Sequence, residues 1–184
     1  GTKDFLEGTG EYAVHLALVY RKKAVLGVVL LPEMEELWFG VVGYGSWCEL
    51  RNGEKKSVRF SNRKILSELI VVASKNHGDD RLDSLVRELD ICVEKAVGSV
   101  GCKVATILRG ETDLYVSLSG KTAPKDWDMA APEAVLLAAG GSFTHADGTH
   151  LKYNTGDVAQ KGLLIASHGR CHDLLCKKFL KEIN

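Results

Sequence analysis

The amino-acid sequence predicts an α+β fold in which an antiparallel sheet comes first and a mixed α/β part follows it. Two observations carry this prediction. Between residues 11 and 50, short apolar runs are separated by tight turns, which is typical of antiparallel strands. Beyond the region 60–64, short β-rich runs alternate with segments of helical periodicity. We therefore expect two parts, residues 1–62 with the antiparallel sheet and residues 63–184 with the α/β arrangement.

The first part contains four predicted strands. Each is a short run rich in apolar and aromatic residues, with alternation in places. Arg21-Lys22-Lys23 predicts the first turn, and Asn52-Gly53 is a typical hairpin turn after the last strand. The predicted strands are residues 11–20, 24–31, 35–42 and 46–50.

The second part alternates between the two kinds of element. Its β-rich runs are short, and its helical segments show apolar residues at helical spacing. The predicted strands are 69–74, 114–118, 142–144 and 162–167, and the predicted helices are 80–89, 100–108, 127–139 and 170–183.

The predicted helix 127–139 is the most informative of these elements. It is rich in small apolar residues and carries one carboxylate, Asp128, at its beginning. The unpaired N–H groups of a helix N-terminus hold such a carboxylate in a defined direction. Pro132 suits the start of a helix, and Gly140 or Gly141 can end it in the left-handed conformation. The simpler interpretation is a buried helix with an aspartate as its N-cap.

Composition excludes several classes of protein. Lysine plus arginine and aspartate plus glutamate both number 24, so nothing indicates a nucleic-acid polymer or a membrane surface as partner. No uncharged apolar run approaches the roughly 18 residues that span a bilayer. The five cysteines include no Cys-x-x-Cys pair, which favours reduced thiols in a cytoplasmic protein. We expect the cluster His168, Cys171, His172 and Cys176 to be structural.

Two motifs at opposite ends of the chain resemble a known family. Gly1-Thr2-Lys3-Asp4-Phe5 and Trp127-Asp128-Met129-Ala130-Ala131-Pro132-Glu133 are similar to the two signature regions of the inositol monophosphatase superfamily. Its members are metal-dependent, typically lithium-sensitive phosphomonoesterases. Lys3 and the Ala-Pro-Glu segment are most similar to the 3'(2'),5'-bisphosphate nucleotidase (CysQ-like) branch. The first signature normally reads Asp-Pro-Leu-Asp-Gly-Thr, and this chain opens after its second aspartate.

The resemblance implies a layered α-β-α-β sandwich of the inositol monophosphatase/fructose-1,6-bisphosphatase type, here incomplete at its N-terminus. Residues 1–62 would be the remainder of an N-terminal domain and 63–184 the C-terminal domain. The implied Mg²⁺ ligands are an upstream glutamate, two aspartates of the first signature, and Asp128, which alone occurs here. We therefore expect the chain to be inactive by itself and to need the missing N-terminal segment of the same protein as its partner.

The resemblance also implies roles for residues at the N-terminus. The backbone amides of Gly1 and Thr2 would meet a phosphate, and the Thr2 hydroxyl would orient a metal-bound water as part of catalysis. Lys3 would belong to the substrate-binding set. The alternative is a frayed N-terminus without a role.

Further substrate-binding candidates follow along the chain. Gly98-Ser99-Val100-Gly101-Cys102-Lys103 resembles a Gly-Ser-x-Gly-x-Lys segment, in which Ser99 and Lys103 would face the nucleotide. Lys121 replaces a glutamate of inositol phosphatases and suits a second phosphate, although an exposed loop lysine is an equal alternative. Ser74-Lys75-Asn76-His77 is a weaker candidate for the same cleft.

Three hypotheses follow for the function. The first is a Mg²⁺-dependent phosphomonoesterase that removes the 3'(2')-phosphate from adenosine 3'(2'),5'-bisphosphate, or from its phosphosulfate relative, in cytoplasmic sulfur assimilation. The second keeps the family but takes an inositol or sugar monophosphate. The third is a non-catalytic fragment that associates with another chain. The sequence leaves the oligomeric state open, with a homodimer as one alternative.

Overall fold

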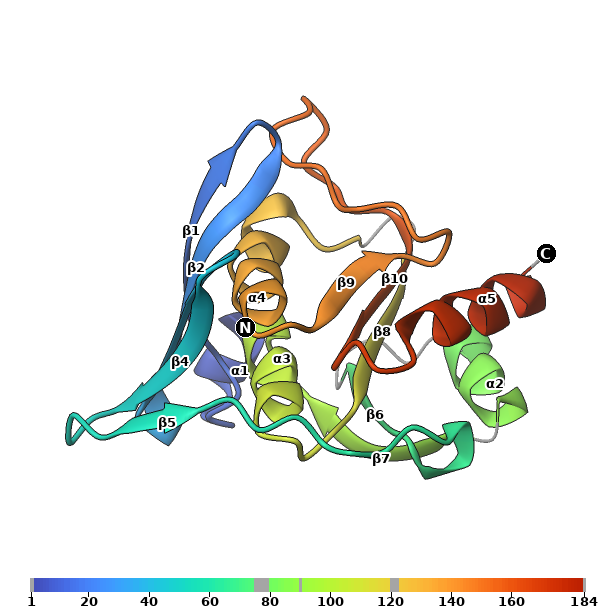
Figure 1. Ribbon diagram of the computed structural model, residues 1–184, viewed down its shortest axis with the longest axis horizontal. Coiled ribbons are helices and arrows are strands. Elements are labelled where there is room, and N and C mark those ends of the chain that lie inside the picture. Colours follow the sequence, from blue (N-terminus) through green and yellow to red (C-terminus); the bar gives the residue numbers. More distant parts are fainter. Residues whose placement is uncertain (1, 75–79, 90, 120–122, 184) are drawn as a thin grey trace.

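The structure is a computed structural model that describes residues 2–74, 80–89, 91–119 and 123–183. Two five-stranded sheets alternate with two layers of helices. Counted from the C-terminal helix, the order is helices, sheet, helices, sheet (Figure 1). The predicted α-β-α-β sandwich is therefore confirmed. One hydrophobic cluster joins both sheets and the helices between them. The division of the chain into two domains at residues 62 and 63 stays a prediction.

The first sheet is antiparallel throughout, as predicted, and its strands are adjacent in sequence order. Arg21 and Lys22 adopt positive φ angles of 48° and 64° in its first turn, the conformation that a two-residue hairpin needs. The last strand was not predicted, because Lys55-Lys56-Ser57 is polar and exposed. The strands are β1 (Val14–Tyr20), β2 (Lys23–Leu31), β3 (Glu36–Val41), β4 (Gly45–Leu50) and β5 (Lys55–Ser57).

The second sheet is mixed and has the strand order β7-β6-β8-β10-β9. β6 pairs in parallel with β7 and β8, and β10 runs antiparallel to β8 and β9. β7 was missed because Glu94 and Lys95 interrupt its apolar sequence. The strands are β6 (Ile70–Ser74), β7 (Cys92–Val97), β8 (Leu114–Ser119), β9 (Ser142–His145) and β10 (Gly162–Ser167).

Two helices lie between the sheets and two cover the far face of the second sheet (Figure 1). None of the helices in the described part of the chain combines the length and the apolar character needed to cross a bilayer. The inner helices are α3 (Val100–Leu108) and α4 (Asp126–Ala138), the outer ones α2 (Asp80–Glu88) and α5 (His172–Ile183), and a short α1 (Thr2–Leu6) precedes β1. Two 3₁₀ turns are Pro32–Met34 and Leu66–Glu68.

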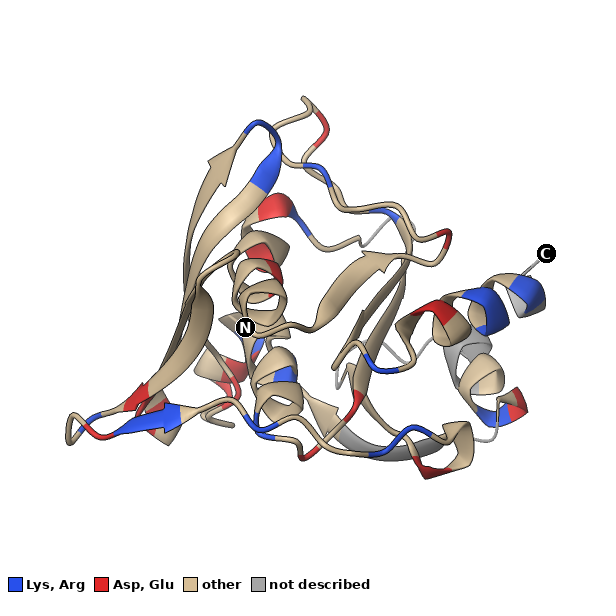
Figure 2. Cartoon of the chain, in the orientation of Figure 1, with Lys and Arg blue, Asp and Glu red and all other residues tan. Residues whose placement is uncertain are grey.

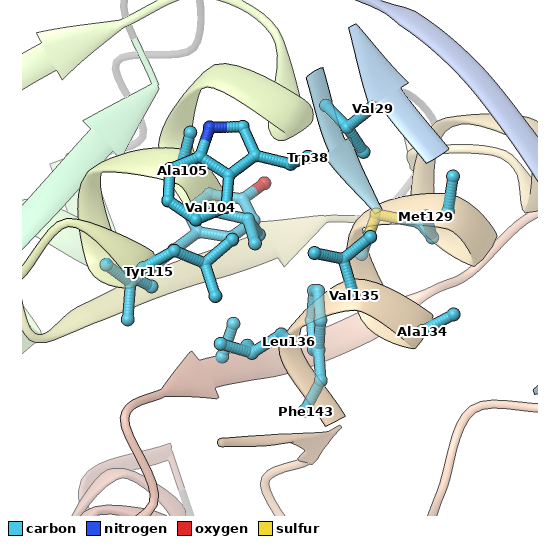
Figure 3. Packing of buried hydrophobic residues seen from close by; sticks show 14 of the residues in the cluster. Val29, Trp38, Val104, Ala105, Tyr115, Met129, Ala134, Val135, Leu136 and Phe143 are labelled. Carbon is cyan, nitrogen blue, oxygen red and sulfur yellow. The ribbon is translucent and has the colours of Figure 1, made fainter. Parts of the chain in front are cut away.

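Helix α4 is the centre of the main core, where Val135 and Leu136 lie near Trp38 and Phe143 (Figure 3). The helix approaches β2 closely, since a Cβ at Gly27 would lie 2.3 Å from the carbonyl oxygen of Ala131. Small residues on both elements permit this distance. The packing fixes α4, and with it the predicted site, against the first sheet.

Candidate functional site

The beginning of α4 presents the carboxylate of Asp128. The helix begins at Asp126, so Asp128 is its third residue and not its N-cap. The Lys125 backbone N–H donates to Asp128 Oδ2 at 2.8 Å, as in one half of a capping box. Asp128 Oδ1 accepts no hydrogen bond from the described residues, and the side chain is partly exposed. One oxygen of Asp128 is therefore held, and the other is available to a ligand.

The expected position of Pro132 was wrong. Pro132 lies inside α4 and not in its first turn, because the helix begins earlier than its proline suggests. The Asp126 N–H finds an acceptor in the Val158 carbonyl at 2.9 Å, a partner that is distant in sequence. At the other end the prediction is confirmed, since Gly140 has a φ of +88° just after the helix.

A second carboxylate in the same turn, that of Asp126, accepts hydrogen bonds at both of its oxygens. It is only 9% exposed. Its Oδ2 accepts from the Asn154 backbone N–H at 3.0 Å, and its Oδ1 accepts from the Gln160 side-chain amide at 2.7 Å. Of the two aspartates, Asp128 is the one with a free oxygen. Sequence reasoning gave Asp126 no role, because its partners lie about 30 residues away and no local pattern marks them.

Residues Thr2–Leu6, which include most of the N-terminal motif, form helix α1. Thr2 and Lys3 are exposed on this helix, and Lys3 lies 3.8 Å from Glu7. Asp4 on the same helix is buried, and a Cβ at Gly98 would lie 2.7 Å from its carboxylate. Helix α1 is thus packed against the loop that precedes α3. The sequence-predicted residues Gly1 and Lys121, and residues 75–77 of the weaker candidate, lie outside the described residues.

The Gly98–Lys103 segment begins a helix as predicted, but its lysine side chain is buried. Ser99 is the N-cap of α3 and accepts from the Gly101 N–H at 3.3 Å. The Gly98 N–H donates to Glu11 Oε2 at 3.0 Å. Lys103 is only 3% exposed, donates to the Gly98 carbonyl, and lies over the Tyr115 ring.

Burial lowers the pKa of the Lys103 ammonium to about 8. Through its hydrogen bond to the Gly98 carbonyl, Lys103 supports the loop from the protein interior. The expectation that it faces a nucleotide stays a prediction.

His15 lies between the starts of α3 and α4. Its Nδ1 is 3.4 Å from the Trp127 carbonyl oxygen, and a Cβ at Gly101 would come within 2.4 Å of its Nε2. Burial lowers the pKa of His15, whereas the charge of Asp128 acts in the opposite direction. A cavity of about 250 Å³ adjoins His15 and Trp127. The structure thus brings the Ser99 loop and Asp128 to neighbouring helix starts.

The described residues do not form a complete metal site. No group of three or more His, Cys, Asp or Glu side chains among them could hold a metal ion. Asp128 fits a hard cation as one ligand, because one carboxylate oxygen is free and the helix start directs it. The remaining ligands that the resemblance implies do not occur in this sequence.

Three members of the His/Cys cluster near the C-terminus contact polar side chains outside the cluster. The His172 ring bridges Ser167 Oγ and Thr144 Oγ1, both at 2.9 Å. Cys176 Sγ lies 3.7 Å from the same threonine hydroxyl, and His168 faces Asp113 at 3.5 Å. These contacts join α5 to the second sheet, as a structural role requires.

Comparison with known proteins gives consistent matches. The model of the inositol monophosphatase family matches residues 1–184. The 3'(2'),5'-bisphosphate nucleotidase CysQ of Salmonella typhimurium is 31% identical over 153 residues, which cover 83% of this chain and 58% of that protein. The CysQ of Escherichia coli K12 is 30% identical, with the same coverages of 83% and 58%. This chain therefore spans little more than half the length of these curated relatives.

A solved structure agrees in fold. The crystal structure of CysQ from Bacteroides thetaiotaomicron, described as a bacterial member of the inositol monophosphatase family, superimposes with a TM-score of 0.78. The match has 24% sequence identity and covers 91% of this chain and 67% of that one.

Proposed function

This chain belongs to the inositol monophosphatase family, and from that premise we propose that the full-length protein is a Mg²⁺-dependent 3'(2'),5'-bisphosphate nucleotidase. The observation that carries the proposal is the first turn of α4, where Asp128 keeps one oxygen free beside the start of α3. The similarity to CysQ proteins favours this branch. The proposed reaction is hydrolysis of the 3'(2')-phosphate of adenosine 3'(2'),5'-bisphosphate.

Each residue of the predicted site has a role in this proposal. Asp128 contributes a carboxylate oxygen to the metal site, and the Thr2 hydroxyl on α1 orients the attacking water. When bound, Mg²⁺ would neutralise phosphate oxygens and activate water near neutral pH. The residues Gly1 and Ser99 and the cations Lys3 and Lys121 form the substrate-binding set, in which Lys121 meets the second phosphate, whereas the buried Lys103 supports the Gly98 loop. Lithium inhibition, cytoplasmic location and a part in sulfur assimilation belong to the same proposal.

The partner of this chain is the rest of the same protein. The outer face of the first sheet is apolar, and on β1 it exposes Leu16 and Leu18 by 66% and 57%. Strands β1 and β2 carry no charge away from their connecting turn (Figure 2). The inner face of this sheet is apolar too, and a sheet apolar on both faces is normally covered on both. We assign the cover to the segment that also supplies the missing metal ligands.

The decisive experiment compares substrates with the purified full-length protein. Phosphate release from adenosine 3',5'-bisphosphate should depend on Mg²⁺ and should exceed release from inositol 1-phosphate. The reverse preference would favour an inositol or sugar phosphatase. Without hydrolysis of either substrate by the full-length protein, a non-catalytic role in association would replace the proposal, a role that the exposed apolar sheet face favours.

A further inference from the structure

The segment between β9 and β10 passes over the start of α4 and reaches the turn between β1 and β2 (Figure 1). The Tyr153 N–H donates to the Lys22 carbonyl at 3.1 Å, which joins this segment to the first sheet. The Gln160 N–H donates to the Pro124 carbonyl at 2.8 Å. We refer to residues 151–160 as the clasp segment.

The clasp segment holds the helix start through Asp126. The Asn154 N–H and the Gln160 amide each donate to one oxygen of its carboxylate, at 3.0 and 2.7 Å. Gln160 Nε2 also donates to the Lys152 carbonyl at 2.9 Å, which orients the amide. The Asp126 N–H in turn donates to the Val158 carbonyl at 2.9 Å. The side chain and the backbone of Asp126 are thus fixed by a segment remote in sequence.

Asp126 stands two residues before Asp128, in the same helical turn. The direction of the free Asp128 oxygen depends on the rotation of that turn, because its other oxygen is tied to the Lys125 N–H. Pro132 has no N–H with which to bind the Asp128 carbonyl, so the helix itself restrains this turn less than usual. A restraint from outside the helix therefore matters here.

We propose that Asp126 is a positioning residue for the metal site: its two hydrogen bonds to the clasp segment set the orientation of the Asp128 carboxylate. This inference rests on the proposed function. Buried groups that orient metal ligands typically change metal affinity or activity on the order of 10- to 100-fold when they are removed. Asp126 acts through Asp128 and does not itself contact the metal.

The test is Asp126→Asn in the full-length protein, with Mg²⁺ response as the readout. The asparagine NH₂ would face one of the two donors that the carboxylate now accepts from. The Mg²⁺ concentration at half-saturation in an isothermal titration of the folded protein, here called the Mg²⁺ midpoint, should increase on the order of 10-fold or more. Gln160→Met, which removes only one donor, should give a smaller increase in the same direction and serves if Asp126→Asn does not fold.

Two controls separate positioning from stability. Asp157→Asn makes the same chemical change on the exposed side of the clasp segment, where Asp157 pairs with Lys161 at 2.7 Å. Leu151→Ala removes a buried side chain of the segment and should lower Tm without moving the Mg²⁺ midpoint. The double variant Asp126→Asn/Gln160→Glu reverses donor and acceptor at constant charge, and it should restore part of the response.

The outcomes are distinct. A Mg²⁺ midpoint that shifts in Asp126→Asn but not in Leu151→Ala supports positioning. If the Mg²⁺ midpoint of Asp126→Asn shifts no more than that of Leu151→Ala while Tm falls in both, Asp126 only attaches the clasp segment to α4. That result would overturn the inference. A wild-type Tm that does not respond to Mg²⁺ would overturn both the metal site and this inference. A Mg²⁺ response without hydrolysis of the bisphosphate would contradict the substrate proposal alone.

Discussion

The phenol of Tyr153 donates a hydrogen bond of 2.5 Å to Glu133 Oε2, and both side chains are buried. The bond joins α4 to the clasp segment about two helical turns after Asp126. Burial raises the pKa of Glu133 to about 7, although the bond from Tyr153 acts in the opposite direction. A carboxyl group that is not at the predicted site thus titrates near neutrality.

The pKa of Glu133 predicts a pH dependence of stability. Its folded-state pKa of about 7 lies above the ordinary glutamate value of 4.5, so the folded state binds the proton more tightly than the unfolded state does. The free energy of unfolding should therefore fall as pH rises from about 4.5 to 7, and the loss should be complete above that. The expected loss is on the order of 3 kcal/mol.

Glu133→Gln keeps an acceptor for Tyr153 and removes the titration. Urea unfolding of the full-length protein at several pH values measures the effect. The variant should show a flatter profile than the wild type across this window, and an unchanged slope would show that Glu133 is not the group responsible.

Asp128→Asn should abolish catalysis while leaving the fold intact. The asparagine oxygen can still accept from the Lys125 N–H, but a neutral amide is a poor ligand for a hard cation. The expected loss in kcat/KM for the bisphosphate is on the order of 10³-fold or more. Asp173→Asn is the matched control, because Asp173 lies exposed in the first turn of α5. Full activity in Asp128→Asn would remove Asp128 from the metal site.

Gly27→Ala should destabilise the protein through the contact between β2 and α4. The new methyl group would lie 2.3 Å from the Ala131 carbonyl oxygen and 3.0 Å from the Ala134 side chain, so strand and helix must separate. Overpacking of this kind typically costs about 1–3 kcal/mol. Chemical denaturation of the full-length protein measures the loss, with Ser57→Ala on the exposed strand β5 as the neutral control. Equal stability of both variants would contradict the close approach of α4 to β2.

The exposed face of β1 predicts opposite results for the chain alone and for the full-length protein. Leu16→Lys and Leu18→Lys place charges on an apolar face that is bare in residues 1–184. In this chain alone they should reduce self-association in sedimentation velocity, because less apolar surface is available for contact. In the full-length protein they should lower Tm, since the same face would be covered. An unchanged Tm there would contradict our assignment of the cover.

Local patterns predicted much of the fold. The hairpins of the first sheet follow from apolar runs and turn residues, and α3 and α4 follow from their small or apolar sequences. The strands that were missed, β5 and β7, are polar or interrupted by charges. They become strands because a neighbouring strand offers unpaired backbone groups, and this depends on the partner and not on the local sequence.

The sequence by itself determined that the chain resembles a phosphatase family and that Asp128 stands at the start of a buried helix. Only the tertiary structure decided which oxygen of Asp128 is free, that Asp126 is held by Asn154 and Gln160, and that Lys103 is buried beneath the Gly98 loop. Residue type and spacing determine helical and strand periods. Which side-chain atoms are buried or hydrogen-bonded depends on the packed neighbours, and the Asp126 contacts join groups 28 and 34 residues apart that meet only after the chain has packed.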